Sequence, residues 1–121
     1  MDKTAPIAEY MTATPHTVGS EQTITFAQKL MKKHGIRHLP VLHGGELYGI
    51  VSDRDLGMIG GLNEVNPDHT TVEEAMTQEA YTVSKDTSLF AVLQEMLEHK
   101  YGSAVVVEGV KIIGIFTTHD S

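Results

Sequence analysis

Two halves of this chain repeat one another at a fixed offset of 65 residues, and no gap is needed to align them. Met11-Thr12 recurs as Met76-Thr77, and Gly49-Ile50 recurs as Gly114-Ile115. The other identities in this register pair Thr17-Val18 with Thr82-Val83, Met31 with Met96, His34 with His99, Val41 with Val106, Gly44 with Gly109 and Asp55 with Asp120. A repeat of this length indicates two copies of one supersecondary unit.

Each copy predicts the same order of elements, β-α-β-β-α, and therefore an α/β fold. A short Thr-Val strand comes first, and an amphipathic helix follows it. The apolar stripe of that helix is Ile24, Ala27, Leu30 and Met31 in the first copy and Leu89, Val92, Leu93, Met96 and Leu97 in the second. The two strands that come next are expected at 39–42 and 47–51, and at 104–107 and 112–116, with glycine-containing hairpin turns at 43–46 and 108–109.

Capping residues should set the ends of the helices. Thr23 is expected to cap the first helix, and Asp86 or Thr87 the helix of the second copy. Gly35 stands where a C-cap glycine belongs. Thr71-Val72-Glu73-Glu74 has the pattern of a capping box that opens a short helix.

The copies are expected to span 7–62 and 72–121, with a polar linker at 63–71. After Asp55 the first copy continues into a small amphipathic helix carrying Leu56, Met58, Ile59 and Leu62, whereas Ser121 alone follows Asp120. We therefore expect the terminal helix of the second copy to be truncated. A unit of about 50 residues buries too little surface alone. The copies should accordingly pack with pseudo-twofold symmetry, and the cleft between them is a candidate ligand site that occurs twice.

Composition narrows the class of partner. Sixteen acidic and nine basic side chains give a formal net charge of -7, which disfavours binding along a nucleic-acid backbone. The sequence has no apolar run near the roughly 18 residues of a membrane span, and its start does not resemble a signal peptide. The absence of cysteine excludes disulfides and thiolate chemistry. We expect a soluble, cytoplasmic protein that contacts neither nucleic acid nor membrane.

The segments 49–55 and 114–120 both have the pattern Gly-x-x-Ser/Thr-x-x-Asp, with a strand running into a helix start. In one interpretation, Ser52 and Thr117 are N-caps and the acid three positions on closes a capping box. In the other, the hydroxyl and the helix N–H groups face an anion, while the carboxylate accepts hydrogen bonds from a ribose diol and the glycine admits a ligand ring. The two interpretations are compatible, and repetition of the pattern favours the second.

The chain resembles the tandem cystathionine-β-synthase-type (CBS) domain pair, also called a Bateman module. The likeness rests on the repeated Met-Thr-x-x-x-x-Thr-Val opening, on Gly-Ile-Arg-His-Leu-Pro-Val at 35–41 and on both Gly-x-x-Ser/Thr-x-x-Asp segments. It covers nearly the whole chain. The resemblance implies a regulatory module that binds AMP, ADP, ATP or S-adenosylmethionine between the repeats and commonly forms disc-like dimers.

The resemblance also implies two sites, each with a ribose-binding acid from one repeat and adenine-contacting residues from the other. The site of Asp120 would take Thr12, Thr17, Ile36, Arg37, His38, Thr117 and His119. The site of Asp55 would take Ser52, Arg54, Thr77, Thr82, Tyr101, Gly102 and Ser103.

The positions of the basic side chains favour one of the two sites for a phosphorylated ligand. Arg37 and Arg54 are the only arginines of the chain, and a guanidinium pairs well with phosphate oxygens, although each is also explained as a solvated surface charge. Arg37 joins His38 and His119 at the Asp120 site, which we favour for a phosphorylated ligand. The truncated terminal helix argues the other way, because it offers fewer oriented N–H groups.

Metal binding and catalysis are poorly supported. Among the seven histidines, His34 and His38 have His-x-x-x-His spacing, but Gly35 is expected to end the helix between them, and no His-Glu-x-x-His spacing occurs. His34 and His99 are expected at helix C-termini, where the helix dipole favours a cation, so we assign them structural roles. No nucleophile elbow or phosphate-binding loop occurs, and the methionines and Tyr48 are assigned to packing. We expect no metal, no cofactor beyond the regulatory nucleotide and no enzyme activity.

Two hypotheses remain at this point. The first is a non-catalytic sensor that binds an adenosine-containing ligand in the cleft and signals to a partner or an attached domain. The alternative is a ligand-free module for dimerisation. In either case we expect a homodimer formed through the amphipathic helices.

Overall fold

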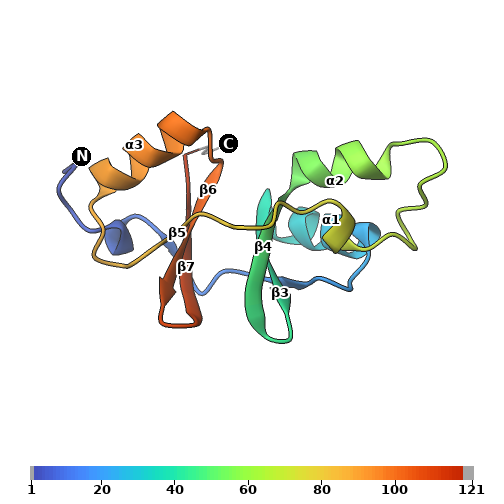
Figure 1. The fold of residues 1–121 in the computed structure, drawn as a ribbon, viewed down its shortest axis with the longest axis horizontal. Coiled ribbons are helices and arrows are strands. Elements are labelled where there is room, and N and C mark those ends of the chain that lie inside the picture. Colours follow the sequence, from blue (N-terminus) through green and yellow to red (C-terminus); the bar gives the residue numbers. More distant parts are fainter. Residues whose placement is uncertain (1, 119–121) are drawn as a thin grey trace. The chain divides into compact units, whose positions relative to one another are not determined.

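The computed structural model describes residues 2–118 and divides the chain into two compact units (Figure 1). We call His16–Ala80 the central unit, and Met1–Pro15 together with Tyr81–Ser121 the terminal unit. Each contains helices and one β-sheet, so the predicted α/β class is confirmed. Residues 2–15 therefore belong with the second copy of the repeat.

The central unit contains a three-stranded sheet in the order β2-β3-β4. Its elements are β2 (Val18–Gly19), α1 (Ile24–His34), β3 (His38–His43), β4 (Glu46–Ser52), α2 (Asp53–Gly60) and the 3-10 helix η2 (Val72–Glu74). Strand β3 is parallel to β2 and antiparallel to β4. The β3–β4 turn places Gly44 and Gly45 at φ of 60° and 83°, values that glycine adopts without strain. Helices α1 and α2 lie side by side (Figure 1).

The terminal unit contains a four-stranded sheet in the order β1-β7-β6-β5. Its elements are the 3-10 helix η1 (Ile7–Glu9), β1 (Thr12–Ala13), β5 (Thr82–Val83), α3 (Leu89–His99), β6 (Ser103–Glu108) and β7 (Lys111–Thr117). The β5-β6-β7 arrangement repeats β2-β3-β4, and β1 extends it as an antiparallel neighbour of β7.

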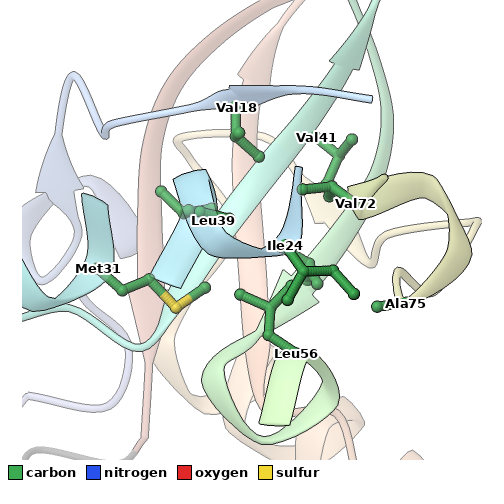
Figure 2. Packing of buried hydrophobic residues seen from close by; sticks show 10 residues of the cluster. Val18, Ile24, Met31, Leu39, Val41, Leu56, Val72 and Ala75 are labelled. Carbon is green, nitrogen blue, oxygen red and sulfur yellow. The ribbon is translucent and has the colours of Figure 1, made fainter. Parts of the chain in front are cut away.

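Each unit has its own apolar core. The central core gathers Val18, Ile24, Ala27, Met31, Leu39, Val41, Val51, Leu56, Val72 and Ala75 (Figure 2). The terminal core gathers Ile7, Leu89, Val92, Met96, Ala104 and Val106. Ile7 and Val72 stand 65 residues apart, and each packs with the strands of the other sequence copy. The two copies have thus exchanged their leading 3-10 helices.

The predicted helix stripes are confirmed at most positions. Ile24, Ala27 and Met31 are buried on α1, and Leu89, Val92 and Met96 on α3, with Leu30 and Leu93 partly buried beside them. The prediction is wrong for Leu97, whose exposed fraction is 83%. One residue further along a helix is a rotation of about 100°, which turns Leu97 away from the face of α3 that carries Met96. Its counterpart in α1 is Lys32, an exposed residue.

The small helix after Asp55 is also present, as α2. Leu56 is fully buried in the central core and Ile59 packs against it. Met58 and Leu62, by contrast, are 61% and 55% exposed. Met58 is therefore an exception to the packing role expected of the methionines, and Leu62 lies beyond the end of the helix at Gly60.

The caps of α1 are as predicted. The Thr23 hydroxyl accepts a hydrogen bond from the Phe26 N–H at 3.1 Å. Gly35 ends the helix in the left-handed conformation, at φ 64° and ψ 36°. Sequence and structure agree here because both caps require a particular residue type.

Two other cap predictions are wrong. Helix α3 is capped by Ser88, whose hydroxyl accepts from the Ala91 N–H at 3.1 Å, and not by Asp86 or Thr87. Thr87 lies in a turn in which its hydroxyl meets that of Ser84 at 3.1 Å. At 71–74 a short 3-10 helix does form, but the Thr71 side chain makes no capping hydrogen bond.

Candidate functional site

One end of the central sheet holds residues from both predicted sites. Strands β3 and β4 pair His38 with Ser52, and the Arg37 carbonyl accepts a hydrogen bond from the Asp53 N–H at 2.8 Å. The segment 36–38 and the segment 52–55 are therefore neighbours at the open end of one β-hairpin. Arg37 and Arg54 are both exposed, whereas Ile36 and His38 are half-buried.

The first turn of α2 forms a complete capping box. The Ser52 hydroxyl accepts from the Asp55 N–H at 3.0 Å, and an Asp55 carboxylate oxygen accepts from the Ser52 N–H at 3.2 Å. The capping interpretation of this segment is confirmed. A carboxylate offers about four acceptor positions, so one capping bond leaves capacity for the hydroxyls of a ligand. The cap fixes the orientation of the carboxylate.

Thr77 joins this end of the central sheet. Its N–H donates to the Ile50 carbonyl at 2.8 Å and its carbonyl accepts from the Ile50 N–H at 2.9 Å. The neighbouring Gly49 has no side chain because a Cβ there would run into the Thr77 carbonyl and the Met76 sulfur. On the side where a Cβ would stand, Gly49 is therefore covered by the chain's own segment, and the expected approach of a ligand ring stays a prediction.

The terminal unit repeats this arrangement on its own sheet. Thr12 pairs with Ile115 and Ser103 pairs with Thr117. A Cβ on Gly114 would run into the side chain of Met11, as one on Gly49 would meet Met76. Both glycines of the Gly-x-x-Ser/Thr-x-x-Asp pattern thus accommodate a Met-Thr segment, which explains why these motifs recur together at the same offset.

Tyr101, a predicted ligand contact, is part of a surface aromatic cluster that no pattern in the sequence indicates. Its ring centroid lies 4.9 Å from that of Tyr81 and 5.3 Å from that of His99, with near-parallel planes in both pairs. Burial raises the pKa of Tyr81, and Glu95 and Tyr101 add to the effect. A base that stacks on Tyr101 would compete with these neighbours.

The predicted site residues divide between the two units. Thr17, Ile36, Arg37, His38, Ser52, Arg54, Asp55 and Thr77 belong to the central unit, and Thr12, Thr82, Tyr101, Gly102, Ser103 and Thr117 to the terminal unit. His119 and Asp120, on which the favoured site depends, lie outside the described residues. Both site assignments therefore stay predictions.

The two helix-terminal histidines differ in their surroundings. His34 stacks on His16 with ring centroids 3.7 Å apart. Burial, together with the charges of His16 and Lys33, lowers the pKa of His34. The prediction that the end of α1 favours a cation at this residue is therefore wrong. His99 instead lies next to the carboxylates of Glu95 and Glu98.

The repeat, the paired hairpins and the capped Ser-x-x-Asp segment define a class of small α/β modules built from two similar halves. The CBS domain profile matches residues 7–56 and 72–120, and the chain belongs to the CBS domain family. The family resemblance drawn from the sequence is thereby confirmed.

Relatives cover nearly the whole chain. The CBS domain-containing protein YhcV of Bacillus subtilis is 30% identical, over 94% of this chain and 81% of that protein. The CBS domain pair of protein MJ0100, solved with 5'-methylthioadenosine and S-adenosyl-L-methionine, is 28% identical with a TM-score of 0.84, over 94% of this chain and 90% of that one. The structure of CBSX2 in complex with AMP is 26% identical with a TM-score of 0.81, over 94% of this chain and 91% of that one.

Within residues 2–118, no helix is both long enough and apolar enough to cross a membrane.

Proposed function

We propose that this protein is a non-catalytic regulatory module of the cytoplasm that binds an adenosine-containing ligand, such as AMP, ADP or ATP, and signals to a partner or an attached domain. The observation that carries the proposal is the capped Ser52–Asp55 segment, which holds a carboxylate in a fixed orientation. Asp120 stands 65 residues further on in the same sequence motif. Adenosine ligands in the MJ0100 and CBSX2 structures support the choice of ligand class.

The proposal assigns each carboxylate the same task. Asp120 and Asp55 would each accept hydrogen bonds from the two hydroxyls of a ribose, with Thr117 and Ser52 near the phosphate end. The Asp120 site is the favoured one for a phosphorylated ligand, because Arg37 would supply positive charge there and His38 and His119 would supply imidazole groups.

Calorimetry with AMP, ATP and S-adenosylmethionine tests the proposal. Removing two charge-assisted hydrogen bonds costs about 3 kcal/mol or more, so Asp120→Ala should weaken binding about a hundredfold or more. Asp55→Ala should leave that site largely intact and cost the fold about 1 kcal/mol through the lost cap. Asp53→Ala is a matched control, since Asp53 is an exposed acid of the same helix turn with no assigned contact to the ligand.

The outcomes separate the two sites and the function itself. Loss of binding in Asp55→Ala but not in Asp120→Ala would make the Asp55 site the real one. No heat and no thermal shift with any of the three compounds would overturn the sensor function. Release of phosphate from ATP would show an enzyme instead.

Dimerisation is the second candidate function, and exposed apolar side chains favour it. Phe26 on α1 is 47% exposed, and on α3 Phe90 is 50% and Leu97 is 83% exposed. We propose a homodimer in which a second copy covers these helices. Sedimentation velocity at high micromolar concentration should show a dimer, and Leu97→Ser should shift it towards monomer. A wild-type monomer would contradict the proposal.

A further inference from the structure

Three side chains on the last turn of α3 bring potential metal ligands together. Glu95, Glu98 and His99 occupy helix positions i, i+3 and i+4, which share one face. The His99 Nε2 atom lies 3.6 Å from a Glu95 carboxylate oxygen and 3.4 Å from a Glu98 carboxylate oxygen. All three ligand atoms lie within 4.8 Å of one another.

These separations suit a shared cation better than direct hydrogen bonds. An N–H···O bond is strongest near about 2.9 Å and is weak at the distances seen here. Two ligands held about 2.0–2.2 Å from one tetrahedral zinc ion are separated by about 3.4 Å, which follows from the tetrahedral angle. The distances from the His99 nitrogen to the two carboxylates therefore already match those between ligands of one shared ion.

The surroundings also favour a cation. The cluster lies where α3 ends, and the negative end of the helix dipole attracts positive charge. The Tyr101 ring stacks on the His99 ring and limits its rotation, which reduces the entropy lost when the imidazole becomes a ligand. The side chains are 47–67% exposed, so water can complete the coordination.

We propose that Glu95, Glu98 and His99 form a binding site for one divalent first-row transition-metal cation of the zinc type. One imidazole nitrogen and two carboxylate oxygens are suitable ligands for such ions. The ion would cross-link the last turn of α3 beside the aromatic cluster. None of the three ligands is assigned to the nucleotide, although Tyr101, which stacks on His99, is, and the metal site does not require a bound nucleotide.

The first copy of the repeat provides an internal control. In the same register, Leu30, Lys33 and His34 replace Glu95, Glu98 and His99, so α1 has the histidine without the carboxylates. His34→Ala therefore removes an equivalent imidazole from a place where no such site is proposed. Glu73→Gln is the matching carboxylate control, since η2 carries exposed glutamates without a histidine.

The test is a Zn²⁺ titration of the full chain, followed by calorimetry and by NMR of the histidine ring signals. We expect the His99 signal to shift first, with one equivalent of Zn²⁺, and chelator to reverse the shift. His99→Ala and Glu95→Gln should each weaken this binding about tenfold or more, whereas His34→Ala and Glu73→Gln should not.

Wild-type affinity in His99→Ala would overturn the proposal. So would a His99 signal that does not move at one equivalent, or an equal loss in His34→Ala, which would indicate adventitious binding to surface imidazoles.

Discussion

Lys100 ends α3 in a backbone conformation that disfavours its residue type, and replacing it by glycine should stabilise the protein. Lys100 has φ 60° and ψ 36°, and its N–H donates to the Met96 carbonyl as the C-cap of α3. Gly35 occupies the equivalent position of α1 at φ 64° and ψ 36°. The two helices thus end with the same geometry, once with glycine and once with a residue that has a Cβ.

Three effects set the size of the change. The left-handed conformation costs a non-glycine residue about 1–2 kcal/mol. Glycine at this position lowers the free energy of unfolding by about 0.4–1 kcal/mol, because it gives the unfolded chain more conformational freedom. Lys100 also contributes about 0.3–1 kcal/mol as a cation at a helix C-terminus, an effect that salt screens. At high ionic strength Lys100→Gly should therefore stabilise the fold by about 0.5–1 kcal/mol, and by less at low ionic strength.

Urea denaturation at 0.05 M and 0.5 M salt measures this change. The midpoint should rise with an unchanged slope, and the thermal midpoint should rise by about 2–5 °C at high salt. Gly35→Ala is the reverse experiment: a Cβ at Gly35 meets no atom within 4 Å, so only backbone strain is added, and about 0.5–1 kcal/mol should be lost. A destabilised Lys100→Gly at high salt would refute the reasoning.

Two further predictions follow from close contacts in the structure. Gly114→Ala should lower the free energy of unfolding by about 1–3 kcal/mol, because the new Cβ clashes with Met11. Adding Met11→Ala should reduce that loss, which a double-mutant cycle by urea denaturation measures. His34 should titrate below 6.5 by NMR, and His16→Ala should move its pKa back towards 6.5. Because the folded-state pKa of His34 is lowered, the contribution of His34 to stability is present above pH 6.5 and is lost as the pH falls through the folded-state pKa. An unchanged His34 pKa in His16→Ala would contradict the role given to His16.

The architecture of each copy could be predicted from sequence where residue type and geometry are tightly coupled. The strands around Val41 and Val106, the hairpin at Gly44 and the Ser52–Asp55 cap all followed from local chemistry. The cap at Ser88 was also available from the repeat, since it stands 65 residues after Thr23. Local propensity favoured Asp86 and Thr87 because both are good capping residues, but the register of the repeat was the stronger constraint.

Less of the candidate site than of the fold could be predicted from sequence, because the geometry of the site depends on contacts between distant segments. The roles of Gly49 and Gly114 required knowing that a Met-Thr segment from the other copy passes over them. The stacking of Tyr101 on Tyr81 joins residues on either side of α3, and neither pattern nor spacing indicates it. The spacing of Glu95, Glu98 and His99 is visible in the sequence, but the histidine-pair patterns typical of metal sites do not include such a mixed set of ligands.

The exchange of leading segments predicts that a mutation in one sequence copy will destabilise the strands of the other. Ile7 is fully buried and packs in the terminal core with Val106, although it precedes the first copy's own strands. Val72 is fully buried in the central core with Val41. Ile7→Ala should cost about 2–5 kcal/mol by leaving a cavity in the terminal core, and Val72→Ala should cost somewhat less because fewer methyl groups are removed.

Amide hydrogen exchange distinguishes which strands respond, since local opening depends on the contacts that each core retains. In Ile7→Ala, protection should fall first at the amides of β6 and β7, with β3 and β4 less affected. In Val72→Ala the order should be reversed, which makes each variant the control for the other. If Ile7→Ala lowered protection mainly in β3 and β4, its side chain would be stabilising the strands of its own copy, and the exchanged packing would be wrong. The same pattern would show that a repeat in sequence need not coincide with a folding unit, because η1 and η2 close the cores of the copies they do not belong to.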